Sequence, residues 1–305
     1  MVNIAAIDFG SNSTRLLIAD IEKTRIVKKL KKHKVTGMAK NIYRTNLLSE
    51  ESIERVKDAL DEFYKEIKLY EVEAIYAIGT SAMRDSSNAN YLVEFVKETY
   101  DIEVEILTGE EEAKLTFYGS QYGLNSVTDC IVVDIGGGST EVINVSNKNI
   151  NTHSYQLGVV RISDQVFKQR PVVGYEEKET IELIKSLLLK KNIVELVTES
   201  TVMLGTGGTF TSLAAIYLNL QRYDNGDTHL TPIDKTWIDD FYSELRLLSE
   251  DEIIVQYTSL DPQRSGTITP GTLIVKTFME FFKINKLLVS ENDILEGLIL
   301  KNILD

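Results

Sequence analysis

The sequence is poor in the residues that build disulfide frameworks, metal clusters and membrane spans. Cys130 is the single cysteine among 305 residues, so no disulfide can form within the chain, and we expect a buried thiol in a cytoplasmic protein. His33, His153 and His229 are scattered without metal-ligand spacing, and we interpret them as structural or surface residues. No window holds about 18 uninterrupted apolar residues, so we expect no membrane span.

Positive charge is also scarce. Lys and Arg total 33 against 46 Asp and Glu, which gives a net charge of −13. An acidic surface argues against bulk nucleic-acid binding, so we expect no nucleic-acid partner. An anionic substrate would meet overall repulsion. Its site therefore needs local basic groups, helix N-termini or a metal ion.

The exception is a dense basic segment, residues 28–34, which is predicted to lie on a strand. One interpretation is an edge strand protected by lysines, and the other is a track for a long polyanion. Strict alternation along a strand predicts two faces. These would hold Lys28, Lys32 and Lys34 on one side and Lys29, Lys31 and His33 on the other.

Apolar runs that end in glycine recur along the chain and predict strands. A first round has strands at residues 4–9, 14–21, 25–35, 74–78 and 103–107 and helices at 49–69, 88–100 and 110–119. A second round has strands at 130–135, 140–145, 150–156, 201–204 and 287–290, with helices at 175–190, 210–218, 235–249, 270–282 and 294–304. Aligning Asp8 with Asp134 places Gly10 on Gly136 and Ser13 on Ser139, a weak internal repeat.

The repeat and the chain length predict an α/β protein of two domains that face each other across a cleft. We place the first domain at residues 1–124 and the second at 125–291. The final helix, 292–305, has the option of packing back on the first domain.

Two related glycine loops follow the first strand of each round. Backbone N–H groups and short polar side chains in such loops converge on phosphate oxygens without steric bulk. Asp8, at the end of the first strand, is placed to hold a metal-bound water. A plain hairpin turn is the competing interpretation, but two such loops in one chain favour phosphate binding. The candidate phosphate contacts are Ser11, Asn12 and Ser13 in the first loop and Gly136, Gly137, Gly138 and Ser139 in the second.

Three further motifs carry candidate groups. Gly205, Gly207 and Gly208 precede a helix and would contact a nucleotide or a distal phosphate, unless they only allow close packing. Arg84 follows a strand and is suited to clamp an oxyanion, with a surface ion pair as the alternative. The three acids at residues 110–112 begin a helix with Thr108 as its expected cap. They either stabilise the helix dipole or supply a carboxylate that activates water.

Taken together, the motifs resemble the exopolyphosphatase/guanosine pentaphosphate phosphohydrolase (Ppx/GppA) family. The matching stretches, in order, are AAIDFGSNSTRLLI, AIGTSAMRDSSNA, ILTGEEEAKL, VVDIGGGSTEV, LGVVRI, GTGGTFTSLAA and DPQRSGTITPG. The resemblance implies two ribonuclease-H-like domains of the actin-like ATPase superfamily. It also implies metal-dependent release of terminal phosphate from polyphosphate or guanosine pentaphosphate, the latter linked to the stringent response.

The resemblance further implies residue roles. Glu112 matches the general base, and Glu141 matches the acid that helps to position water or metal. Asp8 and Asp134 match the acids near a bound Mg²⁺ or other divalent cation. Arg84 matches a phosphate contact, as do the two glycine loops, and Arg264 is our hypothesis for a nucleotide-reading side chain.

Other functions remain open at this stage. A small-molecule kinase of the same superfold, or a non-catalytic actin-like assembly protein that binds a nucleotide, would use similar loops. The terminal ENDILEGL departs from the Arg-Glu-Gly pattern usual in the family, and the basic segment is denser than expected. A symmetric homodimer is the default expectation for the assembly.

Overall fold

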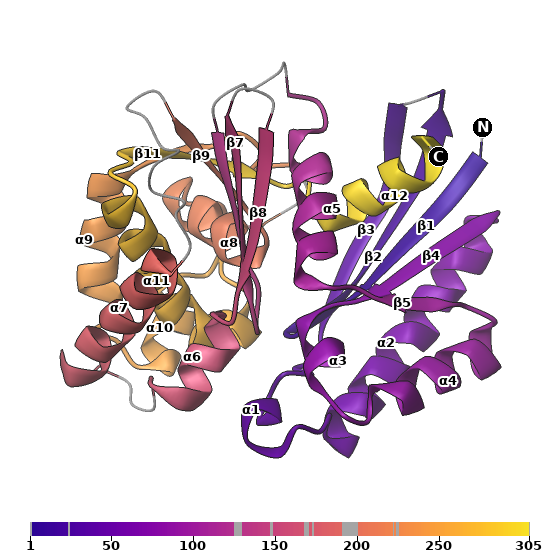
Figure 1. Cartoon of the computed structure of the whole chain (residues 1–305), viewed down its shortest axis with the longest axis horizontal. Helices are drawn as coiled ribbons and strands as arrows, with labels where there is room; N and C mark the ends of the chain where they lie inside the picture. The colour runs from indigo at the N-terminus through magenta and orange to yellow at the C-terminus, as the bar shows by residue number, and fades with distance from the viewer. Residues whose placement is uncertain are drawn as a thin grey trace. The chain divides into compact units, whose positions relative to one another are not determined.

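The computed structural model describes residues 2–23, 25–124, 130–146, 149–167, 171–172, 174–190, 201–221, 223 and 226–304. The chain divides into two compact units. Unit 1 comprises Met1–Gly123 and Asn292–Asp305, and unit 2 comprises Leu124–Glu291. Each unit contains a mixed sheet with helices packed on it, so the predicted α/β class is confirmed (Figure 1).

Unit 1 is built on a five-stranded sheet in the order β3-β2-β1-β4-β5. β1 pairs antiparallel with β2 and parallel with β4. The strands are β1 (Val2–Phe9), β2 (Ser13–Glu22), β3 (Arg25–Val35), β4 (Ala74–Gly79) and β5 (Val104–Ile106). The helices are α1 (Ile42–Thr45), α2 (Glu50–Leu69), α3 (Ser81–Asp85), α4 (Ala89–Tyr100), α5 (Gly109–Gln121) and α12 (Ile294–Leu304).

Unit 2 repeats this pattern and adds one edge strand, in the order β10-β11-β9-β6-β7-β8. β6 pairs antiparallel with β7 and parallel with β9. The strands are β6 (Cys130–Ile135), β7 (Thr140–Ser146), β8 (Asn149–Tyr155), β9 (Val202–Thr206), β10 (Pro232–Asp234) and β11 (Lys286–Ser290). The helices are α6 (Val159–Gln165), α7 (Gly174–Leu189), α8 (Gly208–Tyr217), α9 (Lys235–Leu245), α10 (Glu250–Gln256), the 3₁₀ turn Pro262–Arg264 and α11 (Ser265–Phe281).

The two helices α5 and α12 cross unusually closely within unit 1. A Cβ on Gly119 would lie 1.7 Å from the carbonyl oxygen of Asp293, and one on Gly297 would lie 1.9 Å from that of Leu115. Only glycine at both positions allows the backbones to approach this far. Apolar residues of α12 then complete the core against β1 and β2. They are Ile294, Leu295, Leu298 and Ile299.

Two short helices and one helix start differ from the sequence-based expectation. Arg84 lies in the short helix α3 and the LGVVRI segment forms α6, and the sequence predicted neither helix. We predicted that a helix begins at Pro270, yet α11 begins at Ser265 with the proline inside it. Proline cannot donate to the carbonyl four residues earlier. The Ser163 hydroxyl lies 3.2 Å from that carbonyl, on Gly266, and shares its hydrogen with Val159 O at 2.9 Å, so it partly replaces the missing donor.

Candidate active site

The glycine loop of unit 1 is a tight turn whose carbonyl oxygens accept hydrogen bonds from the segment after β3. The Gly10 N–H donates to Ser13 O at 3.1 Å, the Thr36 and Gly37 N–H groups donate to Asn12 O, and the Ala39 N–H donates to Ser11 O at 2.8 Å. In a trans peptide the C=O and the following N–H point in opposite directions. Carbonyls held against the segment after β3 therefore turn the N–H groups of Asn12 and Ser13 the other way. This arrangement suits an anion-binding nest.

Asp8 is the acid at the end of β1, paired across the hairpin with Arg15. Its Oδ2 accepts from Arg15 Nε at 2.9 Å and from Nη2 at 2.6 Å. Its buried Oδ1 has no hydrogen-bond partner among the described residues, and neither has the buried Ser11 hydroxyl. Burial raises the pKa of Asp8, and Arg15 only partly opposes this shift. The arrangement leaves one carboxylate oxygen of Asp8 for a ligand.

The three acids at the start of α5 have separate roles. Thr108 caps the helix in a capping box with Glu111, and Glu110 and Glu111 are exposed. Glu112 is instead buried, with 8% of its surface exposed, and its Oε2 accepts from Arg84 Nη1 at 2.9 Å. Burial raises the pKa of Glu112 to about 7, although the Arg84 charge opposes the shift. A carboxylate with such a pKa is suited to general-base catalysis near neutral pH.

Arg84 holds Glu112 with only part of its guanidinium. Nη1 donates to Glu112 and also to Leu107 O, at 2.8 Å. The buried Nη2 has no hydrogen-bond partner within the described ranges. Because a buried, unsatisfied donor is costly, this nitrogen is a natural contact for an anionic oxygen.

The glycine loop of unit 2 is built like that of unit 1. The Gly136 N–H donates to Ser139 O at 3.0 Å. The carbonyls of Gly136 and Gly137 accept from the first N–H groups of α6, and that of Gly138 accepts from the Arg161 side chain at 2.9 Å. A Cβ on Gly158 would lie 2.3 Å from Gly137 O, so this support also needs glycine. By the same peptide geometry, the N–H groups of residues 137–139 point away from α6.

Glu141 follows this loop on β7, opposite Asp134. Its side chain is buried, and its Oε1 accepts from the Ser154 hydroxyl at 2.8 Å.

Asp134 lies beside the third glycine loop, residues 205–208, because a Cβ on Gly207 would lie 2.4 Å from Asp134 Oδ1. A Cβ on Gly208 would lie 1.8 Å from Arg264 Nη1. The fold thus brings together Asp134, Gly207, Gly208 and Arg264. A Cβ on Gly205 would lie 2.2 Å from the Phe210 ring, so close packing accounts for this glycine.

The basic segment on β3 is neutralised within unit 1. The β2–β3 register shifts between Ile18 and Ala19, opposite Lys29. Because a bulge breaks strict alternation, the predicted pair of faces is wrong. Lys28 and Lys31 both pair with acids at the start of α12, whereas the pairs formed on α2 are Lys32–Glu66 and Lys34–Glu62. This pairing weighs against a free track for a polyanion.

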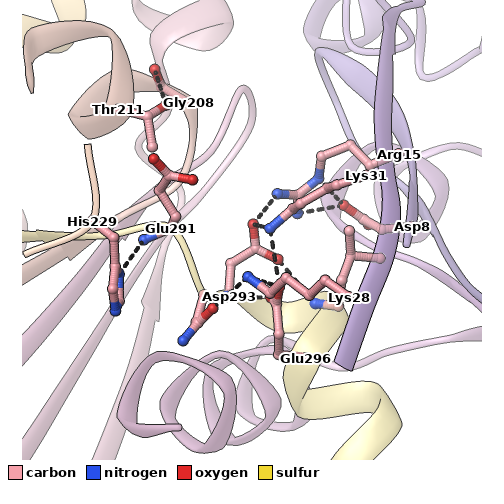
Figure 2. A network of polar contacts seen from close by, with 12 residues as sticks. Asp8, Arg15, Lys28, Lys31, Gly208, Thr211, His229, Glu291, Asp293 and Glu296 are labelled. Atoms are coloured by element: carbon pink, nitrogen blue, oxygen red, sulfur yellow. Dashed lines mark hydrogen bonds and ion pairs between the residues drawn. The ribbon is translucent and has the colours of Figure 1, made fainter. Parts of the chain in front are cut away.

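The network at the start of α12 was not singled out from the sequence (Figure 2). Arg15 lies between Asp8 and Asp293, and Lys31 contacts both Asp293 and Glu296. Hairpin register would have signalled the Asp8–Arg15 pair. Nothing in the local sequence signals Asp293, which is 278 residues from Arg15.

The described residues contain no group of three or more His, Cys, Asp or Glu side chains arranged to hold a metal ion. Mg²⁺ is commonly held by one or two carboxylates together with substrate phosphates. Asp8, with its buried and unpartnered Oδ1, fits that mode of binding. No described helix is long and apolar enough to cross a membrane.

Comparison with known proteins gives a consistent family assignment. The model of the Ppx/GppA phosphatase family matches residues 6–305. A bifunctional 3-dehydroquinate synthase/phosphatase of Fusobacterium nucleatum is 31% identical over 98% of this chain, which spans 46% of that protein. Exopolyphosphatase 2 of Mycobacterium tuberculosis is 27% identical, with 98% of each chain covered. The crystal structure of the Aquifex aeolicus Ppx/GppA family member is similar with a TM-score of 0.83, at 28% identity, over 99% of this chain and 98% of that one.

Proposed function

The chain belongs to the Ppx/GppA phosphatase family, and on that premise we propose that it is a metal-dependent hydrolase that releases terminal phosphate from polyphosphate or guanosine pentaphosphate. The observation that carries the proposal is Glu112: a buried carboxylate with a pKa raised to about 7, held by an arginine that keeps a buried nitrogen unsatisfied among the described residues. The names of the relatives support both substrates. Exopolyphosphatase 2 matches over 98% of its length, and a guanosine-5'-triphosphate,3'-diphosphate pyrophosphatase of Vibrio atlanticus matches over 58% of its length.

In this mechanism a water oxygen attacks the terminal phosphorus while the bond to the bridging oxygen breaks. Glu112 accepts the proton of the water, and the shortened polyphosphate or nucleotide leaves as an anion. Phosphoryl transfer depends chiefly on positioning and charge neutralisation. Arg84 Nη2 and the N–H groups of the two glycine loops would supply donors to the phosphate oxygens. Glu141, held by Ser154, would orient the water or the cation.

Asp8 and Asp134 are the residues that we propose to hold the divalent cation. When bound, the cation supplies positive charge that neutralises the phosphate oxygens as the bond breaks. The ion pairs of Lys32 and Lys34 with α2 leave little unpaired charge for a polymer, so we expect binding of long chains to depend on the loops rather than on β3.

The test is phosphate release with Mg²⁺ from long-chain polyphosphate, guanosine pentaphosphate and ATP, side by side. Glu112→Gln should lower the rate by about 10²–10⁴-fold, because it removes the base. Glu111→Gln is the matched control, since it lies one residue away, is exposed and can retain the capping box. Chelation of the metal should abolish release. ATP consumption with neither other substrate cleaved would favour the kinase or the assembly protein instead.

The choice between the two substrates can be tested at Arg264. Its guanidinium lies on the third glycine loop, where a nucleotide would be read if one binds there. Arg264→Ala should then weaken use of guanosine pentaphosphate more than use of polyphosphate. Unchanged selectivity would overturn a nucleotide-reading role for this side chain.

A further inference from the structure

Six charged side chains form a network at the junction of α12 with the first three strands of unit 1 (Figure 2). Three are acids and three are bases, so the network is neutral as a set. Glu296 has no exposed surface, and Asp8 and Asp293 have 2% and 4%. The members are Asp8, Asp293, Glu296, Arg15, Lys28 and Lys31.

The pairing of Arg15 within this network is asymmetric. Both Nε and Nη2 donate to the same oxygen of Asp8, Oδ2, at 2.9 and 2.6 Å. Nη1 donates to Asp293 Oδ2 at 2.6 Å. A guanidinium facing a single carboxylate favours the two-oxygen, fork-to-fork arrangement. Here Asp293 binds Nη1 of the same guanidinium. Asp8 Oδ1 is left without a partner among the described residues.

Asp293 is itself held firmly. Its Oδ1 accepts from Leu295 N–H at 3.0 Å, and its own N–H donates to Glu296 Oε2 at 2.8 Å. Lys31 Nζ lies 3.3 Å from its Oδ2. With both oxygens engaged and the side chain buried, Asp293 presents a fixed acceptor to Arg15.

We propose that Asp293, at the start of the C-terminal helix, is a positioning residue for Asp8. By holding Arg15 Nη1, it keeps Arg15 on one oxygen of Asp8 and reserves the other oxygen for a divalent cation. The inference rests on the proposed function for the metal role of Asp8. It adds that α12 takes part in building the site, acting through Arg15 without contacting the substrate.

The test compares variants of the full chain by direct titration of Mn²⁺, followed by electron paramagnetic resonance, with phosphate release and thermal unfolding measured in parallel. Asp293→Asn keeps the size of the side chain and removes its charge. It should raise the dissociation constant for Mn²⁺ by about 10–100-fold, as loss of an outer partner of a metal ligand commonly does. Asp8→Asn should abolish binding at the same site.

Lys28→Met is the matched control. Lys28 pairs with Glu296 and Asn292 at 2.9 and 2.6 Å, so it belongs to the same network without contacting Arg15. It should lower the melting temperature and leave the Mn²⁺ dissociation constant unchanged. Equal losses of Mn²⁺ affinity in both variants, or wild-type affinity in Asp293→Asn, would overturn the positioning role. Wild-type Mn²⁺ affinity in Asp8→Asn would also overturn the positioning role. The proposed function is tested separately, by phosphate release from the wild-type protein.

Discussion

Unit 1 and unit 2 place an aspartate and a glycine turn at the same point of the same strand pattern. Gly10 N–H bonds to Ser13 O in one, and Gly136 N–H bonds to Ser139 O in the other. In both, the segment after the third strand of the pattern holds the loop carbonyls. The residue that pairs with the aspartate on the neighbouring strand differs. Asp8 pairs with Arg15, whereas Asp134 pairs with Glu141. The repeated scaffold thus presents anion-binding loops twice but distributes its charged side chains differently.

The helices that follow the last parallel strand of each pattern differ in a similar way. α5 follows β5 and begins with the acids that include Glu112, while α12 follows β11 and begins near Asp293. Glu112 is paired with one arginine, and burial raises its pKa to about 7. Burial alone would raise the pKa of Asp293 too, but Arg15 and Lys31 hold it well below its usual range. One acid is poised to accept a proton and the other stays ionised.

In the comparison of the two units, the largest expected effect concerns the supports of the two loops. Gly158→Ala should lower kcat/KM by about 10²-fold or more. The added Cβ would meet Gly137 O at 2.3 Å and displace the loop, and small displacements of a positioning group carry costs of this size. Gly37→Ala is the counterpart in unit 1. It should cost about 1 kcal/mol of stability through its φ of +61°, with little loss of activity, because the nearest atom to the new Cβ is 3.5 Å away.

Steady-state phosphate release and thermal unfolding measure both variants. Equal losses of activity would mean that the two loops tolerate displacement alike, and the contrast between the units would fail.

The second prediction concerns the residue facing the aspartate in unit 2. Glu141→Gln keeps a group able to accept from Ser154 but loses the charge, and kcat should fall by about 10–100-fold. Thr140→Val is the neighbouring control, because its hydroxyl donates to Leu157 O at 2.6 Å. Its loss should cost about 1 kcal/mol of stability and leave kcat unchanged. Wild-type kcat in Glu141→Gln would show that the charge of Glu141 plays no part in catalysis.

The third prediction uses pH to separate the two buried acids. Glu112 must be ionised to act as a base, so kcat/KM should fall about tenfold per pH unit below about 7. Glu112→Gln should remove this limb from the residual activity, and Glu111→Gln should retain it. A flat profile between pH 5 and 8 in the wild type would contradict the assignment.

The contributions of the two acids to the free energy of unfolding should change in opposite directions with pH. The folded state binds the Glu112 proton more tightly than the unfolded chain does, so this residue lowers the free energy of unfolding as pH rises from about 4.5 to about 7. Asp293 has a lowered pKa, so its contribution is present above about 3.8 and is lost as pH falls further. Thermal unfolding of Glu112→Gln against wild type should show a difference that grows in favour of the variant from pH 5 to pH 8.

The smallest effect is expected at Lys34, at the end of β3. Lys34 and Glu62 form an exposed pair, so Lys34→Ala should change the free energy of unfolding by less than about 1 kcal/mol. It should also leave the rate on long polyphosphate unchanged. Lys31→Met, in contrast, should cost more, because it removes one of the two bases that pair with each of the buried acids Asp293 and Glu296. Chemical denaturation measures both. A clear loss of polyphosphate affinity in Lys34→Ala would restore the interpretation of β3 as a track.

The sequence by itself predicted most of what depends on neighbours along the chain. The aspartate–glycine turns, the strand and helix order and the Thr108 cap follow from short-range periodicity and capping chemistry. The start of α11 was predicted five residues late, because a proline is usually read as a first-turn residue. Its helix is instead continued with help from Ser163, which is remote in sequence.

Only the tertiary structure decided which groups are buried and paired. Three consecutive acids begin α5, and folding buries just Glu112 of these beside Arg84. The bulge opposite Lys29 redistributes the lysines of β3, and α12 brings Asp293 to Arg15 across 278 residues. The physical reason is that burial and charge pairing depend on distance in space. Local periodicity determines the direction of each side chain within its own element, whereas its electrostatic environment is set by elements that the chain brings together only on folding.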